Sequence, residues 1–142
     1  MFLGRITIPL LVAVLAASPS FSKPAPEEHE QIALQEGCDK NQTNMNTCAF
    51  YDRRVLEAEL NELYKQQLTR VAGTVHMKRL IAAQRAWLKY VETDCLYQVG
   101  PVAESGTMWS LEQNSCKSGH FTQRVELLKS FLSCTQNGCP GQ

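Results

Sequence analysis

Short motifs typical of catalytic or metal sites are missing from this sequence. It contains no H-E-x-x-H zinc pattern and no G-x-S-x-G nucleophile pattern. Its three histidines, His29, His76 and His120, do not have the spacing of paired ligands. The cysteines form neither a C-x2-C pair, which zinc sites favour, nor a C-x-x-C-H haem-attachment pattern. We therefore expect a protein that is not an enzyme and that holds no cofactor and no metal ion.

The chain also has no excess of positive or negative charge. The chain has 14 Lys and Arg residues and 14 Asp and Glu residues. It shows no stripe of cations interleaved with aromatic side chains, the pattern with which proteins neutralise phosphates and stack on bases. We therefore expect no nucleic-acid partner.

The main apolar run lies at the N-terminus. It covers residues 6–17, follows a single cation, Arg5, and is shorter than the roughly 20 residues needed to span a bilayer. Because small residues follow the run, it predicts a cleavable export signal over residues 1–22, cut before Lys23. The mature chain then has a net charge of about −1, no membrane anchor, and a periplasmic or secreted location.

All cysteines lie in the mature chain, and an even number of cysteines in an exported chain predicts disulfides. They are Cys38, Cys48, Cys95, Cys116, Cys134 and Cys139. We favour Cys38–Cys48, Cys95–Cys116 and Cys134–Cys139, because the last pair spans an Asn-Gly turn and the second closes a long connection. The alternative pairs Cys48 with Cys95, which lie equally far from a predicted helical turn, and Cys38 with Cys116.

Apolar residues recur at spacings of three and four, and no segment alternates as a strand does. The pattern predicts helices from about Thr43 to residue 72 and from Val75 to about residue 97. The short link around Gly73 makes these two helices antiparallel. Weak periodicity over residues 99–115 predicts a long connection with a short helix near residues 111–112, before a third helix over residues 122–133. The fold class is therefore all-α: an antiparallel helical hairpin plus a third packing helix, stapled by disulfides.

The mature N-terminus differs from the rest of the chain. Residues 23–37 contain two prolines and an acidic cluster, which predict a flexible segment that becomes helical only toward residues 32–34. The helical domain is expected to cover residues 38–142.

Two blocks resemble the LprI-type lysozyme-inhibitor family. Residues 45–49 and 59–64 are similar to its first helix, and residues 80–90 to its Leu…Gln-Arg-x-Trp-x-x-Tyr pattern, with Cys95 at the expected distance. Val91 departs from the family, which usually has Arg there. The positions that carry the resemblance, called the signature residues below, are Leu60, Asn61, Tyr64, Gln84, Arg85, Trp87 and Tyr90. Trp87 and Gln84 fall on an apolar stripe, so we expect structural roles for both.

The resemblance implies a protein that binds and inhibits lysozyme. The lysozyme cleft holds the two carboxylates that perform its chemistry, so a rigid protrusion that fills the cleft is sufficient. We expect the disulfide-closed connection to be that protrusion. Its expected contacts are Glu104, Ser105, Thr107 and Trp109. Two alternatives stay open: the segment is a plain connection with Trp109 packed inward, or the protein is an envelope structural or assembly module that binds another exported protein.

Overall fold

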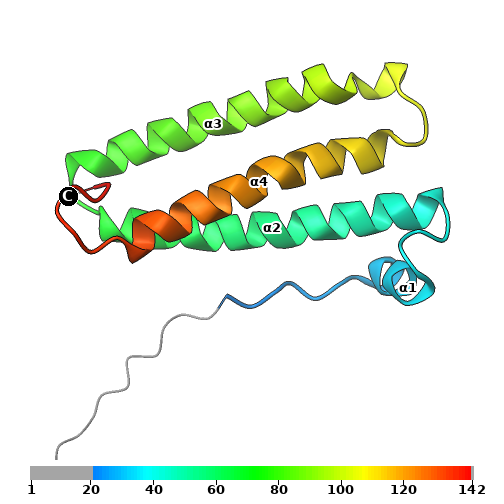
Figure 1. Ribbon diagram of the computed structural model, residues 1–142, viewed down its shortest axis with the longest axis horizontal. Helices are drawn as coiled ribbons and strands as arrows, with labels where there is room; N and C mark the ends of the chain where they lie inside the picture. Colours follow the sequence, from blue (N-terminus) through cyan, green and yellow to red (C-terminus); the bar gives the residue numbers. More distant parts are fainter. Residues whose placement is uncertain (1–20, 142) are drawn as a thin grey trace, which may run out of the picture.

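The computed structural model describes residues 21–141, which form four α-helices and one short 3-10 helix (Figure 1). These are α1 (Glu28–Glu36), α2 (Gln42–Arg70), α3 (Val75–Val99), η1 (Val102–Glu104) and α4 (Trp109–Ser133). No strand occurs in this part of the chain, which confirms the predicted all-α fold. None of the described helices is long and apolar enough to cross a membrane. Residues 1–20 of the predicted export signal lie outside the described residues.

Helix α3 runs antiparallel to α2 and to α4, which point in the same direction, and α4 contacts both arms of the hairpin formed by α2 and α3 (Figure 1). Helix α4 packs most extensively on α2, α3 packs on α4, and α1 packs on α2. The core they enclose consists of Leu60, Val91, Cys95, Phe121, Val125 and Leu128. Burial of one large apolar side chain contributes about 1.5–3 kcal/mol. The helix that follows the hairpin therefore completes its core, as the sequence predicted.

Local side-chain chemistry sets the ends of the hairpin helices. Asn41 Oδ1 accepts a hydrogen bond from the backbone N–H of Asn44 at 2.9 Å and caps the start of α2. Thr74 Oγ1 accepts from the N–H of His76 at 3.2 Å and caps α3. Between them, Gly73 has a φ of +76°, which favours glycine. The predicted turn around Gly73 is confirmed.

The start of the last helix was predicted wrongly. Helix α4 begins at Trp109, so the predicted long connection over residues 99–115 shortens to residues 100–108, and no separate short helix exists near residues 111–112. The first half of α4 buries a polar residue, Asn114, whose Oδ1 accepts from Arg53 Nε of α2 at 2.8 Å. Because amide and disulfide side chains occupy this part of the packing face, the apolar period is weak although the segment is helical.

The mature N-terminus is more ordered than expected. Helix α1 begins at Glu28 rather than near residue 32, with a capping box formed by Glu27 and Glu30. Glu30 is fully buried and its carboxylate is paired with the guanidinium of Arg54 on α2. An acidic cluster next to prolines predicts exposed side chains. The sequence pattern therefore gave no sign of the Glu30–Arg54 ion pair that docks α1 on α2. The division of the chain at residues 37 and 38 stays a prediction.

Three disulfides connect the elements in the pairing that we favoured. They join Cys38 to Cys48, Cys95 to Cys116, and Cys134 to Cys139, with Cα–Cα distances of 5.8, 5.8 and 5.7 Å. The alternative that pairs Cys48 with Cys95 is absent from this structure. The first disulfide ties the α1–α2 turn to α2, the second joins α3 to α4, and the third staples the segment after α4.

Candidate functional site

The loop of residues 100–108 connects α3 to α4 at one end of the bundle, beside the start of α2 (Figure 1). It contains η1 and is closed at its base by the Cys95–Cys116 disulfide. The carbonyl of Thr107 accepts a hydrogen bond from Asn46 Nδ2 of α2 at 3.0 Å. The loop is therefore anchored to all three long helices.

Side chains inside the loop fix its shape. Ser105 Oγ lies 3.3 Å from the carbonyl oxygen of Val99 and 3.0 Å from that of Pro101. Trp109 Nε1 donates to the carbonyl of Gly100 at 3.1 Å, which closes the neck of the loop. These bonds, together with the disulfide, restrict the conformations of the loop, and pre-organisation of this kind reduces the entropy lost on binding.

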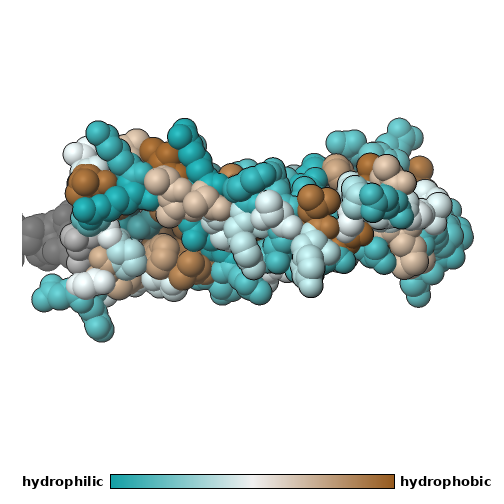
Figure 2. Space-filling model, turned by 90° about the horizontal axis from the view of Figure 1, so that it is seen from above, coloured by the Kyte–Doolittle hydropathy of each residue, from teal (hydrophilic) through white to brown (hydrophobic). Residues whose placement is uncertain are grey.

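The outer surface of this end of the molecule carries exposed apolar side chains. Val102 is 62 % exposed, Met108 46 % and Tyr97, at the end of α3, 88 %. Glu104 and Thr107 are also exposed. Figure 2 shows hydrophobic residues interspersed with hydrophilic ones at the right-hand end of the molecule, where the loop lies. We call Tyr97, Val102, Glu104, Thr107 and Met108 the apical surface.

The four contacts expected from the sequence divide into two kinds. Glu104 and Thr107 are exposed and belong to the apical surface. Ser105 and Trp109 are partly buried, and their polar atoms are used in hydrogen bonds within the loop. Sequence reasoning did not single out Val102 or Met108, because a lone apolar residue in a loop gives no sign of whether it is exposed.

A polar contact between α3 and α4 lies deeper in the bundle. Gln84 is buried, and its Oε1 accepts from Arg124 Nε at 3.0 Å and from Nη2 at 2.8 Å. Burial lowers the pKa of the Arg124 guanidinium, partly opposed by Tyr64. That guanidinium lies 5.4 Å from the ring centre of Trp87, which in turn packs against Phe121 at 5.9 Å. We call Gln84, Arg124 and Trp87 the α3–α4 latch.

One cluster has the residue types of a metal site. Single ligand atoms of Cys95, Cys116 and His120 lie within 4.8 Å of one another. Both sulfurs are joined in a disulfide, whereas zinc binds thiolates. His120 Nε2 lies 2.8 Å from Asp94 Oδ2, and the ring meets Tyr90 edge to face. The cluster therefore has the chemistry of a structural cross-link.

Comparison with known proteins decides the family. The family model "Lysozyme inhibitor LprI" matches residues 36–128. The chain belongs to the LprI lysozyme-inhibitor family. It is also 26% identical to an uncharacterized protein of Rhizobium meliloti (strain 1021) over 145 residues, covering 94% of this chain and 99% of that protein. No solved structure matches. LprI is a family of inhibitors and not of enzymes.

The LprI match covers α2, α3, the whole loop 100–108 and most of α4. It includes the Cys38–Cys48 and Cys95–Cys116 disulfides, whereas Cys134–Cys139 lies beyond it.

The LprI signature residues lie in several environments. Leu60 and Gln84 are buried, Trp87 and Tyr64 are partly buried, and Asn61, Arg85 and Tyr90 are exposed. The first four lie on the packing faces of α2 and α3, where they contribute to the core or to the α3–α4 latch. Most of the signature therefore describes how the LprI helices pack, while the loop provides the exposed surface.

Proposed function

We propose that this protein is an exported lysozyme inhibitor that blocks the lysozyme cleft with the loop 100–108. The observation that carries the proposal is the match of the lysozyme-inhibitor family model to residues 36–128, which include the entire loop. Lysozyme acts through two carboxylates in its cleft, so occupation of that cleft prevents access of the polysaccharide. The inhibitor itself needs no catalytic group.

The geometry of the loop supports this mode of inhibition. The loop stands at one end of the bundle, and the Cys95–Cys116 disulfide and the bonds of Ser105 and Trp109 keep it rigid. Its exposed apolar residues, Val102 and Met108, provide area to bury, and Thr107 and Glu104 provide polar contacts at the rim. Interfaces depend on such a combination of apolar anchors and polar rim.

Two features support an extracytoplasmic location. The N-terminal pattern over residues 1–22 is that of an export signal. All six cysteines are paired, and disulfides persist in oxidising compartments such as the periplasm and the cell exterior. Both features are consistent with export to the compartment where lysozymes attack bacteria.

The direct test is inhibition of cell-wall lysis by the purified, oxidised protein over residues 23–142. We expect the rate of lysis by at least one lysozyme type to fall as the protein is titrated to micromolar concentration. Lysozymes of several types, including the chicken type, belong in the panel. Full lytic activity of every lysozyme at saturating protein would reject inhibition and favour an envelope assembly module instead.

A further inference from the structure

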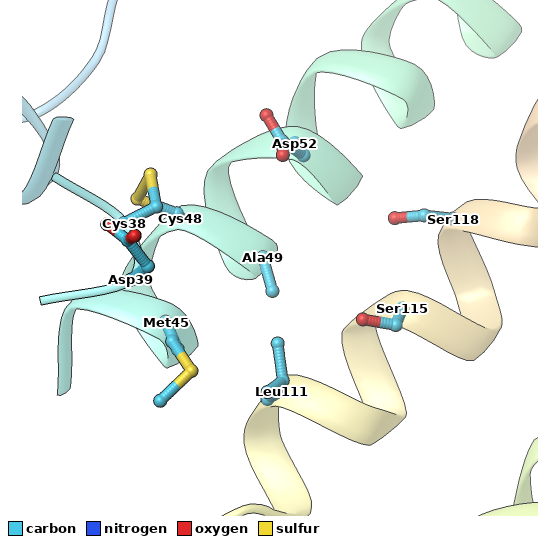
Figure 3. Close-up of a pocket in the computed structure, with 9 residues that line it drawn as sticks. All are labelled: Cys38, Asp39, Met45, Cys48, Ala49, Asp52, Leu111, Ser115 and Ser118. Carbon is cyan, nitrogen blue, oxygen red and sulfur yellow. A yellow bond between two sulfur atoms is a disulfide. The ribbon is translucent and has the colours of Figure 1, made fainter. Parts of the chain in front are cut away.

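A groove between α2 and α4 lies beside the loop. It is separate from the hydrophobic core and from the α3–α4 latch. It has a volume of about 460 Å³ and receives no residue from α3. Met45 and Ala49 of α2 and Leu111 of α4 form its apolar floor. Figure 3 shows Ala49 and Leu111 pointing toward each other across the groove. A long side chain fits such a space with its aliphatic part against this floor.

Two carboxylates, Asp39 and Asp52, line the same groove. Both are exposed, and within residues 21–141 neither forms an ion pair or a side-chain hydrogen bond. They therefore contribute unpaired negative charge to the groove.

The cations adjacent to these aspartates in the sequence are engaged elsewhere. Lys40 Nζ lies 3.1 Å from Glu36 Oε2. Arg53 is bound to Glu57 at 2.6 Å and to Asn114. Arg54 is paired with the buried Glu30. Because each neighbouring cation already has a carboxylate partner, the groove is left to attract a cation from outside the chain.

A hydroxyl group gives an independent indication of a ligand. Ser118 Oγ is buried and has no hydrogen-bond partner within the described residues. Ser118 lines the groove, and Figure 3 shows its hydroxyl and that of Ser115 pointing from α4 toward α2. A buried polar atom without a partner is uncommon and calls for an explanation, of which a water, an ion or a ligand group that completes it is one. An N–H donor that enters the groove satisfies it.

We propose that the α2–α4 groove binds a lysine or arginine side chain of the lysozyme that this protein inhibits. The inference rests on the proposed function. The aliphatic stem lies on Met45, Ala49 and Leu111, and the cationic head lies near Asp39 and Asp52, where charge-assisted hydrogen bonds form. The groove adjoins the loop, since Asn46, next to Met45, donates to the carbonyl of Thr107. One partner therefore contacts the apical surface and the groove together.

The experiment compares charge reversals inside and outside the groove. Asp52→Lys and Asp39→Lys reverse a groove carboxylate, while Glu92→Lys reverses an exposed carboxylate on α3, which contributes nothing to the groove. The dissociation constant for lysozyme is measured for each oxidised protein by calorimetry, at about 50 mM and about 300 mM salt. Thermal melting checks that each variant is folded.

We expect Asp52→Lys and Asp39→Lys to raise the dissociation constant by about tenfold or more and to reduce its salt dependence. Glu92→Lys is expected to leave it within about twofold. Acetylation of the lysozyme lysines, which removes their charge, distinguishes a lysine from an arginine as the bound residue. Wild-type inhibition together with equal affinity of the groove variants would overturn the groove proposal while leaving the proposed function intact.

A lysozyme-independent probe separates the two proposals further. A tri-arginine or tri-lysine peptide is titrated into the oxidised protein, and amide shifts are followed by NMR. Shifts centred on Ala49, Leu111 and Ser118 that disappear in Asp52→Lys support the groove even where no lysozyme is inhibited. Shifts that are absent, or that spread equally to Glu92, reject it.

Discussion

The amide oxygen of Gln84 on α3 accepts two hydrogen bonds from the guanidinium of Arg124 on α4, at 3.0 and 2.8 Å. The two residues are 40 positions apart in the sequence, and both are at least partly buried. This contact joins the second and third long helices in the half of the bundle remote from the loop, since Gln84 lies nearer the start of α3 and Arg124 nearer the end of α4. It gives the Gln-Arg-x-Trp block a structural role in this chain, because Gln84 and Trp87 both contact Arg124.

Removal of the latch acceptor is expected to destabilise the fold. Gln84→Ala leaves the partly buried Arg124 guanidinium without its acceptor, at a cost of about 2–3 kcal/mol in the free energy of unfolding. Urea denaturation measures the change. Arg85→Ala is the matched control, because Arg85 is adjacent in sequence but exposed, and it should cost no more than about 0.5 kcal/mol. Equal losses from the two variants would contradict a latch.

The buried ion pair between Glu30 and Arg54 makes the docking of α1 sensitive to acid. Burial raises the pKa of Glu30, but the hydrogen bonds from Arg54 and from the N–H of Glu27 outweigh it and lower the pKa below the ordinary value of 4.5. A lowered pKa in the folded state gives stability that is complete above the unfolded pKa. This stability is lost as pH falls through the lowered value.

Glu30→Gln should remove this acid dependence. The wild type is expected to lose stability as pH falls below about 4.5, with α1 exchanging its amide hydrogens faster. Glu30→Gln should be less stable at neutral pH, because the buried end of the pair loses its charge, and should change less on acidification. Identical pH profiles of unfolding for the two proteins would show that α1 is held by other contacts.

How far the sequence predicts this fold depends on which side chains fill the packing faces. Helices α2 and α3 were predicted from their apolar stripes. The turn between them was predicted from Gly73, whose φ of +76° in the structure is one that favours glycine. The first half of α4 does not follow, because Asn114 and Cys116 occupy its packing face with a hydrogen bond and a disulfide. Helical periodicity detects apolar burial and does not detect polar residues that are satisfied in the core.

The candidate site was predictable in outline only. The segment that closes with the Cys95–Cys116 disulfide was identified from the sequence, and the structure shows it as an anchored loop. The sequence did not predict which of the expected contacts are exposed, because that depends on the folded loop: Glu104 is exposed, whereas Trp109 is partly buried and bonded to Gly100. The groove was missed because its residues come from parts far apart in the sequence: Asp39 from the α1–α2 turn, Asp52 from α2, and Leu111 and Ser118 from α4.

Opening the loop at its base should weaken inhibition. The double change of Cys95 and Cys116 to serine removes a cross-link with a sequence separation of 21, which is worth about 3 kcal/mol of stability. The freed loop must then be ordered on binding, so the inhibition constant should rise. The matched control replaces Cys134 and Cys139, whose disulfide lies outside the family match. If this control reduced inhibition as strongly, the effect would reflect general stability and not the loop.

Paired valine substitutions test whether the apical surface of loop 100–108 inhibits lysozyme. Val102→Asp places a charge on the loop, and Val75→Asp places the same charge on a valine of similar exposure, 57 % against 62 %, at the opposite end of α3. The inhibition constant of each oxidised protein is measured in a cell-wall lysis assay. We expect Val102→Asp to raise this constant at least about tenfold and Val75→Asp to leave it unchanged. Equal inhibition by both variants and the wild type would contradict this expectation.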